Sequence, residues 1–103
     1  MAKKIIWTVS AQEDRKSILL YWNKRNKSNA YSLKLNKLFI EATEILALRP
    51  LTGRLTNLKD IRVKIVIDYL LVYKHSDTEI LVLAIFDSRQ DPDLFENILK
   101  SSI

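Results

Sequence analysis

The chain has no cysteine, one glycine, one histidine and two prolines among its 103 residues. The absence of cysteine excludes disulfides, thiolate metal ligands and cysteine nucleophiles, and a single histidine would leave a zinc site dependent on carboxylates. No apolar run approaches the roughly 20 residues that a membrane-spanning helix needs, and the N-terminus lacks the apolar core of a signal peptide. We therefore expect a cytoplasmic protein with no metal, no cofactor and no membrane contact.

Basic residues outnumber acidic ones, 17 against 12, so the formal net charge is +5. This excess suits a polyanionic partner, either a nucleic acid or an acidic protein, although many small basic proteins bind no anion specifically. The chain is long enough for one hydrophobic core, because 48% of its residues are apolar. We expect a single domain over residues 1–103.

The N-terminal quarter predicts a strand followed by a helix. Residues 3–9 form a β-branched and aromatic run that is typical of a strand. Ser10 and Glu13 then match the S-x-x-E capping box, which predicts a helix over residues 11–25. Its apolar stripe contains Ala11, Ile18 and Trp22.

A second helix is predicted from Ser28 as N-cap to the neighbourhood of Arg49 and Pro50. Residues 51–59 contain the only glycine, Gly53, and have neither helical nor strand periodicity, so they predict a connecting loop. One stripe of the second helix is apolar: Tyr31, Leu35, Leu38, Ala42, Ile45 and Leu46.

Residues 61–92 predict three antiparallel strands joined by tight turns at Asp68-Tyr69 and at residues 76–78. In the first of these strands, apolar residues alternate with mainly basic ones. The apolar set is Val63, Ile65 and Ile67, and the other set is Arg62, Lys64 and Val66. We expect the cations, with Lys74, to project to an open sheet face or its edges.

Asp91, Pro92 and Asp93 have the order of an N-cap, a first-turn proline and a first-turn acid. They predict a short C-terminal helix with Leu94, Phe95, Ile98 and Leu99 as its apolar residues. The elements together predict a two-layer α+β fold, in which an N-terminal strand, a helical hairpin and a three-stranded antiparallel meander precede this helix.

Several motifs occur in a fixed order along nearly the whole chain. They are W-x-x-x-A at Trp7 and Ala11, R-P at Arg49, Y-L-L-V-Y at residues 69–73 and F-D-S-R-Q-D-P at residues 86–92. This ordered set resembles the RelE/ParE superfamily of bacterial type II toxins. The resemblance implies a growth-inhibiting toxin, associated with plasmid stabilisation and neutralised by a cognate antitoxin.

The RelE-like branch consists of enzymes that cut messenger RNA on the ribosome without a metal. The resemblance would give catalytic roles to Arg89 and to further cations, for which Arg62, Lys64 and His75 are the candidates. The family's second arginine, however, falls at Leu70, and its C-terminal tyrosine falls at Phe95. Leucine cannot hold a phosphate and phenylalanine cannot transfer a proton.

The ParE-like branch inhibits DNA gyrase and needs a binding surface but no general acid or base. It also has a long helical hairpin, which residues 11–48 resemble. We therefore favour a ParE-like gyrase inhibitor that is not an enzyme, with a RelE-like ribonuclease as the alternative. A basic nucleic-acid-binding domain without toxicity is a third hypothesis, although no helix-turn-helix or basic arm is present.

Each candidate residue also has a simpler structural interpretation. Partner or nucleic-acid contacts are expected from five cations: Arg54, Arg62, Lys64, Lys74 and Arg89. The structural alternative for Arg89 is that it pairs with Asp87 and Asp91 and so holds the turn after the last strand. His75 fits a solvated turn residue, and the aromatic residues Tyr21 and Trp22 fit the core as well as base stacking.

Overall fold

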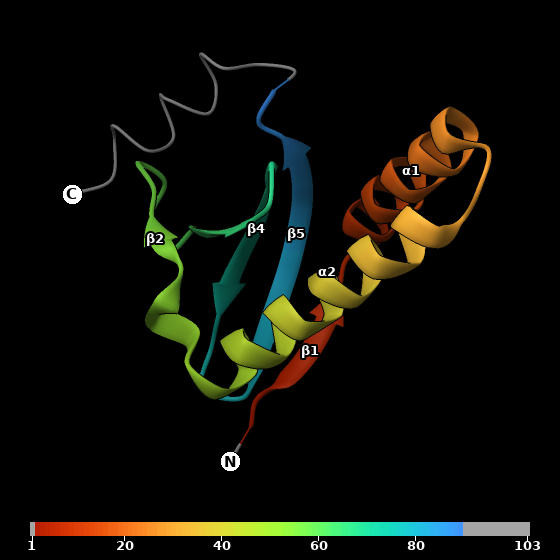
Figure 1. Ribbon diagram of the computed structural model, residues 1–103. Helices are drawn as coiled ribbons and strands as arrows, with labels where there is room; N and C mark the ends of the chain where they lie inside the picture. The colour runs from red at the N-terminus through yellow and green to blue at the C-terminus, as the bar shows by residue number, and fades with distance from the viewer. Residues whose placement is uncertain (1, 90–103) are drawn as a thin grey trace.

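The computed structural model of the protein describes residues 2–89 and contains two long helices packed on a five-stranded sheet (Figure 1). The elements in chain order are β1 (Lys4–Trp7), α1 (Val9–Asn26), α2 (Ala30–Leu48), a 3-10 turn η1 (Pro50–Thr52), β2 (Arg54–Leu55), β3 (Arg62–Val66), β4 (Tyr69–His75) and β5 (Glu79–Asp87). The predicted α+β fold is confirmed. The predicted helix at residues 91–99 lies outside the described residues.

The strand order in the sheet is β1-β5-β4-β3-β2. The predicted meander is present, because β3, β4 and β5 pair as antiparallel neighbours. The N-terminal strand β1 pairs in parallel with β5, and β2 pairs with β3 at the opposite edge. The first strand, β1, is therefore paired in the described sheet only with the last strand, β5.

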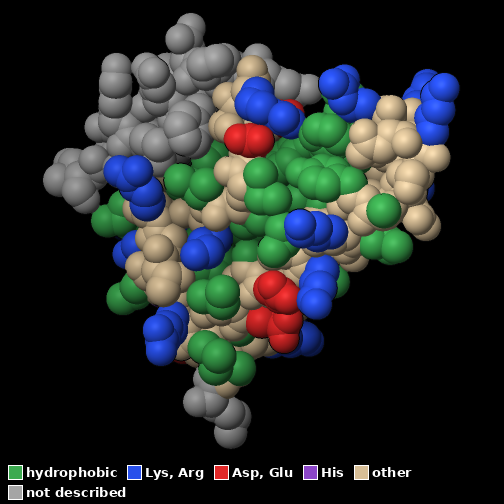
Figure 2. Space-filling model, viewed as in Figure 1, with side chains coloured by type: hydrophobic (Ala, Val, Ile, Leu, Met, Phe, Trp, Pro, Cys, Tyr) green, Lys and Arg blue, Asp and Glu red, His purple; other side chains and the backbone are tan. Residues whose placement is uncertain are grey.

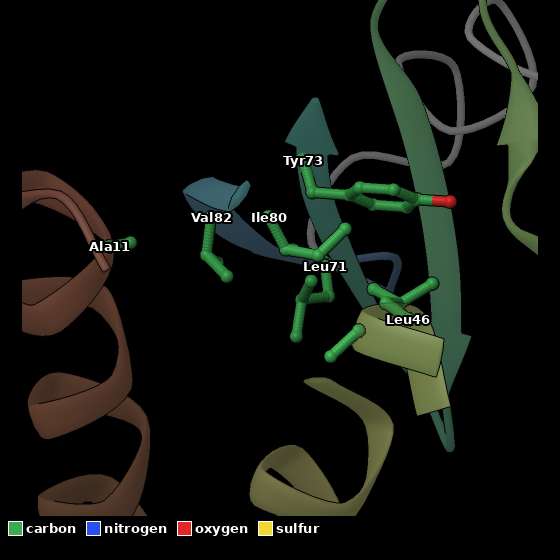
Figure 3. Close-up of a cluster of buried hydrophobic side chains, with 7 residues drawn as sticks. Ala11, Leu46, Leu71, Tyr73, Ile80 and Val82 are labelled. Carbon is green, nitrogen blue, oxygen red and sulfur yellow. The ribbon is translucent and has the colours of Figure 1, made fainter. Parts of the chain in front are cut away.

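The core lies between the helices and one face of the sheet. In β4, the residues Tyr69, Leu71 and Tyr73 alternate toward this face and are nearly or fully buried. Leu71 and Tyr73 pack with Ala11 of α1 and Leu46 of α2 in one cluster (Figure 3). Burial of these side chains from both helices provides the main driving force for joining the two layers.

The predicted capping box at Ser10 and Glu13 is wrong, because α1 begins one residue before Ser10. Its N-cap is Thr8, whose hydroxyl accepts a hydrogen bond from the backbone N–H of Ala11 at 3.1 Å. The same hydroxyl donates to the carbonyl of Leu83 in β5 at 3.2 Å. Thr8 therefore caps the helix and ties it to the sheet, which a cap at Ser10 would not do.

Smaller differences occur at three connections. Asn29, not Ser28, is the N-cap residue of α2, although the Ser28 hydroxyl still accepts from the N–H of Ala30. The segment predicted as a loop contains η1 and β2. The first hairpin turn consists of Ile67 and Asp68, since Tyr69 is already paired with Val66 in the sheet.

The expected orientation of β3 is also wrong. Arg62 and Lys64 pair with Tyr73 and Leu71, so they lie on the same sheet face as the helices. Val66, also on this face, packs in one cluster with Phe39 and Ala42 of α2. The alternation is real, but the helices cover the side that carries the cations.

Candidate functional site

An open groove of about 730 Å³ lies between α1 and the ends of β4 and β5. Figure 2 shows apolar side chains gathered between α1 and the sheet, with charged groups at their margin. Four of the lining residues are aromatic, and four are charged with opposite signs. The aromatic residues are Tyr21, Trp22, Tyr69 and Phe86, and the charged ones are Asp14, Arg25, Asp87 and Arg89.

Arg89 is held at the margin of this groove by two carboxylates. Its Nε and Nη2 atoms donate to the two oxygens of Asp87, each at 3.1 Å. The backbone N–H of Arg89 also donates to Asp87 at 2.9 Å, and Nη1 lies 3.6 Å from an oxygen of Asp68. A bidentate pair of this kind fixes the guanidinium plane as well as its position. We call this cluster the Arg89 corner.

The ion pair changes the acid–base properties of both groups at the Arg89 corner. Partial burial raises the pKa of Asp87, but the side-chain and backbone hydrogen bonds from Arg89, together with its charge, outweigh burial and leave the pKa below its usual value. The hydrogen bond to Asp87 raises the pKa of Arg89. Both groups are therefore ionised at neutral pH and largely neutralise each other.

Trp22 and Tyr69 form an aromatic platform below the guanidinium of Arg89. The indole Nε1–H of Trp22 donates to the Tyr69 hydroxyl at 2.7 Å. The guanidinium carbon lies 5.6 Å from the Trp22 ring centre and 5.9 Å from that of Tyr69. Burial raises the pKa of the Tyr69 hydroxyl. Trp22 is partly buried and packs against the core, as expected. The core expectation for Tyr21 is wrong, because Tyr21 is 52% exposed.

Arg62 occupies a second cluster at the other end of β4, which we call the Arg62 corner. Its Nη1 donates to the backbone carbonyl of Gly53 at 2.8 Å. The Tyr73 hydroxyl accepts from the N–H of Gly53 at 3.0 Å and donates to the carbonyl of Pro50 at 2.6 Å. Among the described residues, Arg62 has no carboxylate within ion-pairing distance. Its positive charge is therefore not neutralised locally.

The four residues proposed for catalysis do not meet at one place. Arg89 lies beside Tyr69, whereas Arg62 pairs with Tyr73, four residues or about 13 Å further along the strand. His75 is at the far end of β4, beyond Tyr73. A phosphate group held by Arg89 would thus be out of reach of His75, so these two candidate residues do not form an acid–base pair.

The remaining cations are spread over different surfaces. Lys64 pairs with Leu71 and lines a shallow groove between α2 and β3. Lys74 is exposed near the end of β4, and Arg54 is exposed on the edge strand β2. These residues provide separate points of positive charge and no single basic patch.

The sequence analysis missed two acids near the groove, Asp14 in its lining and Asp68 beside Arg89. Asp14 of α1 accepts from the backbone N–H of Ile85 at 3.0 Å, across 71 residues of chain. Asp68 was assigned to a turn, but its carboxylate faces Arg89. The sequence contained a signal only for Asp68. The hairpin turn before Tyr69 is expected to lie near the end of the neighbouring strand, where Arg89 follows.

Within residues 2–89, no cluster of three or more histidine or carboxylate side chains is arranged to hold a metal. The helices of this region are also too short or too polar to span a bilayer.

A family model described as "ParE toxin of type II toxin-antitoxin system, parDE" matches residues 5–92. The chain belongs to this ParE toxin family. A solved structure, "Chromosomal ParDE TA system from P. aeruginosa", has the same fold, with a TM-score of 0.72 at 18% identity over 84% of this chain and 96% of that one. No curated protein sequence matches the chain.

The family match confirms the RelE/ParE resemblance and decides between its branches. This chain is a ParE-like toxin of a type II toxin–antitoxin system, and the RelE-like and non-toxic alternatives are not favoured. A toxin of such a system has a cognate antitoxin as its partner.

Proposed function

We propose that this ParE-family toxin blocks replication by binding DNA gyrase and that it does so without catalysing a reaction of its own. The observation that carries the proposal is the state of Arg89. Its guanidinium is engaged by Asp87 and Asp68, so it is not available to stabilise a phosphorane as a ribonuclease would require.

A binding inhibitor needs exposed contact groups, and α1 supplies them. Leu20 and Tyr21 are 55% and 52% exposed on adjacent positions of the helix. Tyrosine is among the aromatic residues that are enriched at protein interfaces, and the exposed leucine beside it adds apolar contact area. We assign the gyrase contact to this surface of the helical hairpin.

The test compares two variants in two purified assays, supercoiling by gyrase and cleavage of message on ribosomes. We expect the wild type to inhibit supercoiling and to leave message intact. Arg89→Ala should keep inhibition within about threefold, because Arg89 has a structural role at a half-exposed site. Leu20→Asp combined with Tyr21→Ala should abolish inhibition, with Lys59→Ala, an exposed lysine between β2 and β3, as the surface control. Cleavage of message that disappears in Arg89→Ala would overturn the proposal.

We assign the antitoxin contact to the shallow groove of about 240 Å³ between α2 and β3. Three isoleucines, Ile45, Ile65 and Ile67, are each between 45% and 49% exposed there. Lys64 lies beside them, and Arg62 adds a cation on the same strand. This combination suits an antitoxin segment that buries apolar side chains and carries acidic residues opposite the two cations.

Co-expression tests the antitoxin contact. Ile65→Asp should weaken antitoxin binding by about 100-fold, because it places a carboxylate in an apolar contact. Lys74→Asp, a charge change at an exposed position of β4, should leave binding unchanged. Full protection of cells by the antitoxin against Ile65→Asp would refute this assignment without affecting the gyrase proposal.

A further inference from the structure

A row of five side chains runs along the outer surface of α2, and we call it the α2 seam. Its members are Leu33, Lys37, Ile40, Glu44 and Leu48. Spacings of three and four residues place them on one side of the helix. Leu33, Ile40 and Leu48 are 63%, 42% and 69% exposed, so the seam presents three large apolar side chains to solvent.

The α2 seam lies opposite the face of α2 that packs in the core. The core face carries Leu35, Phe39, Ala42 and Leu46, all 5% exposed or less. No described element covers the seam, and it is separate from the groove between α2 and β3. Figure 2 shows acidic and basic side chains side by side over α2. Exposed leucines and isoleucines in a row with charges between them are typical of a helix-pairing surface.

Charge on the outer side of α2 is divided between its two halves. Lys34 and Lys37 lie in the N-terminal half, and Glu41 and Glu44 lie in the C-terminal half. This order is opposite to the one that the helix dipole favours, and neither terminal turn contains a compensating charge. Contacts within the helix do not explain it either, because the exposed Lys37–Glu41 pair is 4.0 Å long and has the less favourable order of lysine before glutamate.

An antiparallel neighbour with the same sequence would make this order favourable. With the two-fold axis near Ile40 and Glu41, each Lys37 would lie opposite Glu44 of the other copy. Leu33 would lie opposite Leu48 at both ends, and the two helix dipoles would run in opposite directions. The apolar residues and the charges are thus both self-complementary about one axis.

We propose that two copies of this toxin pair through the α2 seam as an antiparallel two-fold dimer. The contact is limited to one helix of 19 residues on each side. It is smaller than a standard stable interface, and each copy has a net charge of +5 that opposes association. The dimer therefore dissociates on dilution, with an expected dissociation constant of about 10 µM.

Charge reversal tests the register of the dimer. Lys37→Glu places like charges together twice and should raise the dissociation constant of the full-length toxin, measured by sedimentation equilibrium, by about tenfold. The double variant Lys37→Glu with Glu44→Lys restores opposite charges and should recover dimerisation. Lys24→Glu on α1 is the matched control and should have no effect. Circular dichroism verifies that the helices remain folded.

A single introduced cysteine provides a second test, because the natural chain has none. Ile40→Cys lies next to the proposed axis and should form a cross-linked dimer under mild oxidation. Leu20→Cys, similarly exposed on α1, should cross-link far more slowly. A wild-type toxin that stays monomeric at about 100 µM, ten times the expected constant, would overturn the proposal. Equal cross-linking of the two cysteine variants would also overturn it. So would a toxin that is monomeric and whose affinity for the antitoxin falls in Lys37→Glu.

Discussion

The Arg62 corner and the Arg89 corner place an arginine beside a buried tyrosine at opposite ends of β4, yet they use the arginine differently. Arg62 donates to backbone carbonyls, which accept hydrogen bonds but carry no net charge. Arg89 donates to carboxylates, which remove most of its charge from the surface. Both arginines hold a turn in place, but only Arg62 keeps a charge that a partner can use.

The comparison shows why residue type and chain position are insufficient to assign a catalytic arginine. Arg89 has the position expected for a nuclease, and its local contacts favour a structural role. Arg62 has the weaker claim by position but remains electrostatically available. We therefore expect the stability contributed by the Arg62 corner to depend mainly on packing, and the stability contributed by the Arg89 corner to depend mainly on charge.

The largest effect is expected at Gly53. An added Cβ would lie well inside van der Waals contact with the Tyr73 hydroxyl and ring, so Gly53→Ala must displace one of them. We expect a loss of about 3 kcal/mol in the free energy of unfolding. Arg54→Ala is the neighbouring control. Urea unfolding gives the comparison, and a loss below about 1 kcal/mol would show that η1 can shift without cost.

Tyr73→Phe should have the next largest effect. It leaves the carbonyl of Pro50 and the N–H of Gly53 without their buried partner. The expected loss is about 2 kcal/mol. Because this variant also removes the atom that clashes first in Gly53→Ala, the double variant should lose less than the sum of the two. Strict additivity would contradict the close approach of Gly53 and Tyr73.

Tyr69→Phe is the matched change at the Arg89 corner, with a smaller expected loss of about 1 kcal/mol. Here a single donor, the indole N–H of Trp22, loses its acceptor, and that site is only partly buried. Thermal unfolding of the two Tyr→Phe variants side by side measures the difference. A larger loss for Tyr69→Phe than for Tyr73→Phe would reverse our ranking of the two corners.

The smallest effect concerns pH at Asp87. Its folded-state pKa is lowered, so its contribution to stability is present at neutral pH and is lost as the pH falls through that pKa. Asp87→Asn should therefore be less stable than the wild type at pH 7 by less than about 1 kcal/mol, since Arg89 is half exposed. The gap should shrink as the pH falls below the ordinary carboxyl pKa of about 4 and should close below the lowered folded-state pKa. A gap that stays constant over this range would mean that the pair contributes no charge-dependent stability.

Local signals in the sequence predicted the ends of helices and strands correctly where a single local preference determined them. The end of α2 is an example, because the residue before a proline avoids the helical conformation, and α2 indeed stops at Leu48, before Arg49 and Pro50. The start of α1 was wrong because Thr8 and Ser10 are both capable caps. A tertiary contact decided between them, since the Thr8 hydroxyl also reaches Leu83.

The candidate site was less predictable, because it depends on contacts between distant segments. The alternation in β3 separates the residues of its two faces but does not indicate which face the helices cover. The sequence analysis placed Arg62 and Lys64 on the open face, whereas they lie on the face that the helices cover. Asp14 and Ile85 are 71 residues apart, and no local pattern links them. The pairing of Arg89 with Asp87 was expected as one of two interpretations because the two residues are neighbours in sequence.

The parallel pairing of β1 with β5 has a consequence for the order in which the toxin matures. The hydrogen bond from Thr8 to Leu83 spans 75 residues, and β1 has no other strand beside it in the described sheet. A nascent chain can form the local α1–α2 hairpin early, but it cannot complete the sheet until β5 has left the ribosome. The open groove beside α1 and the Arg89 corner both include residues of β5, so they are the last parts of the described structure to form during synthesis.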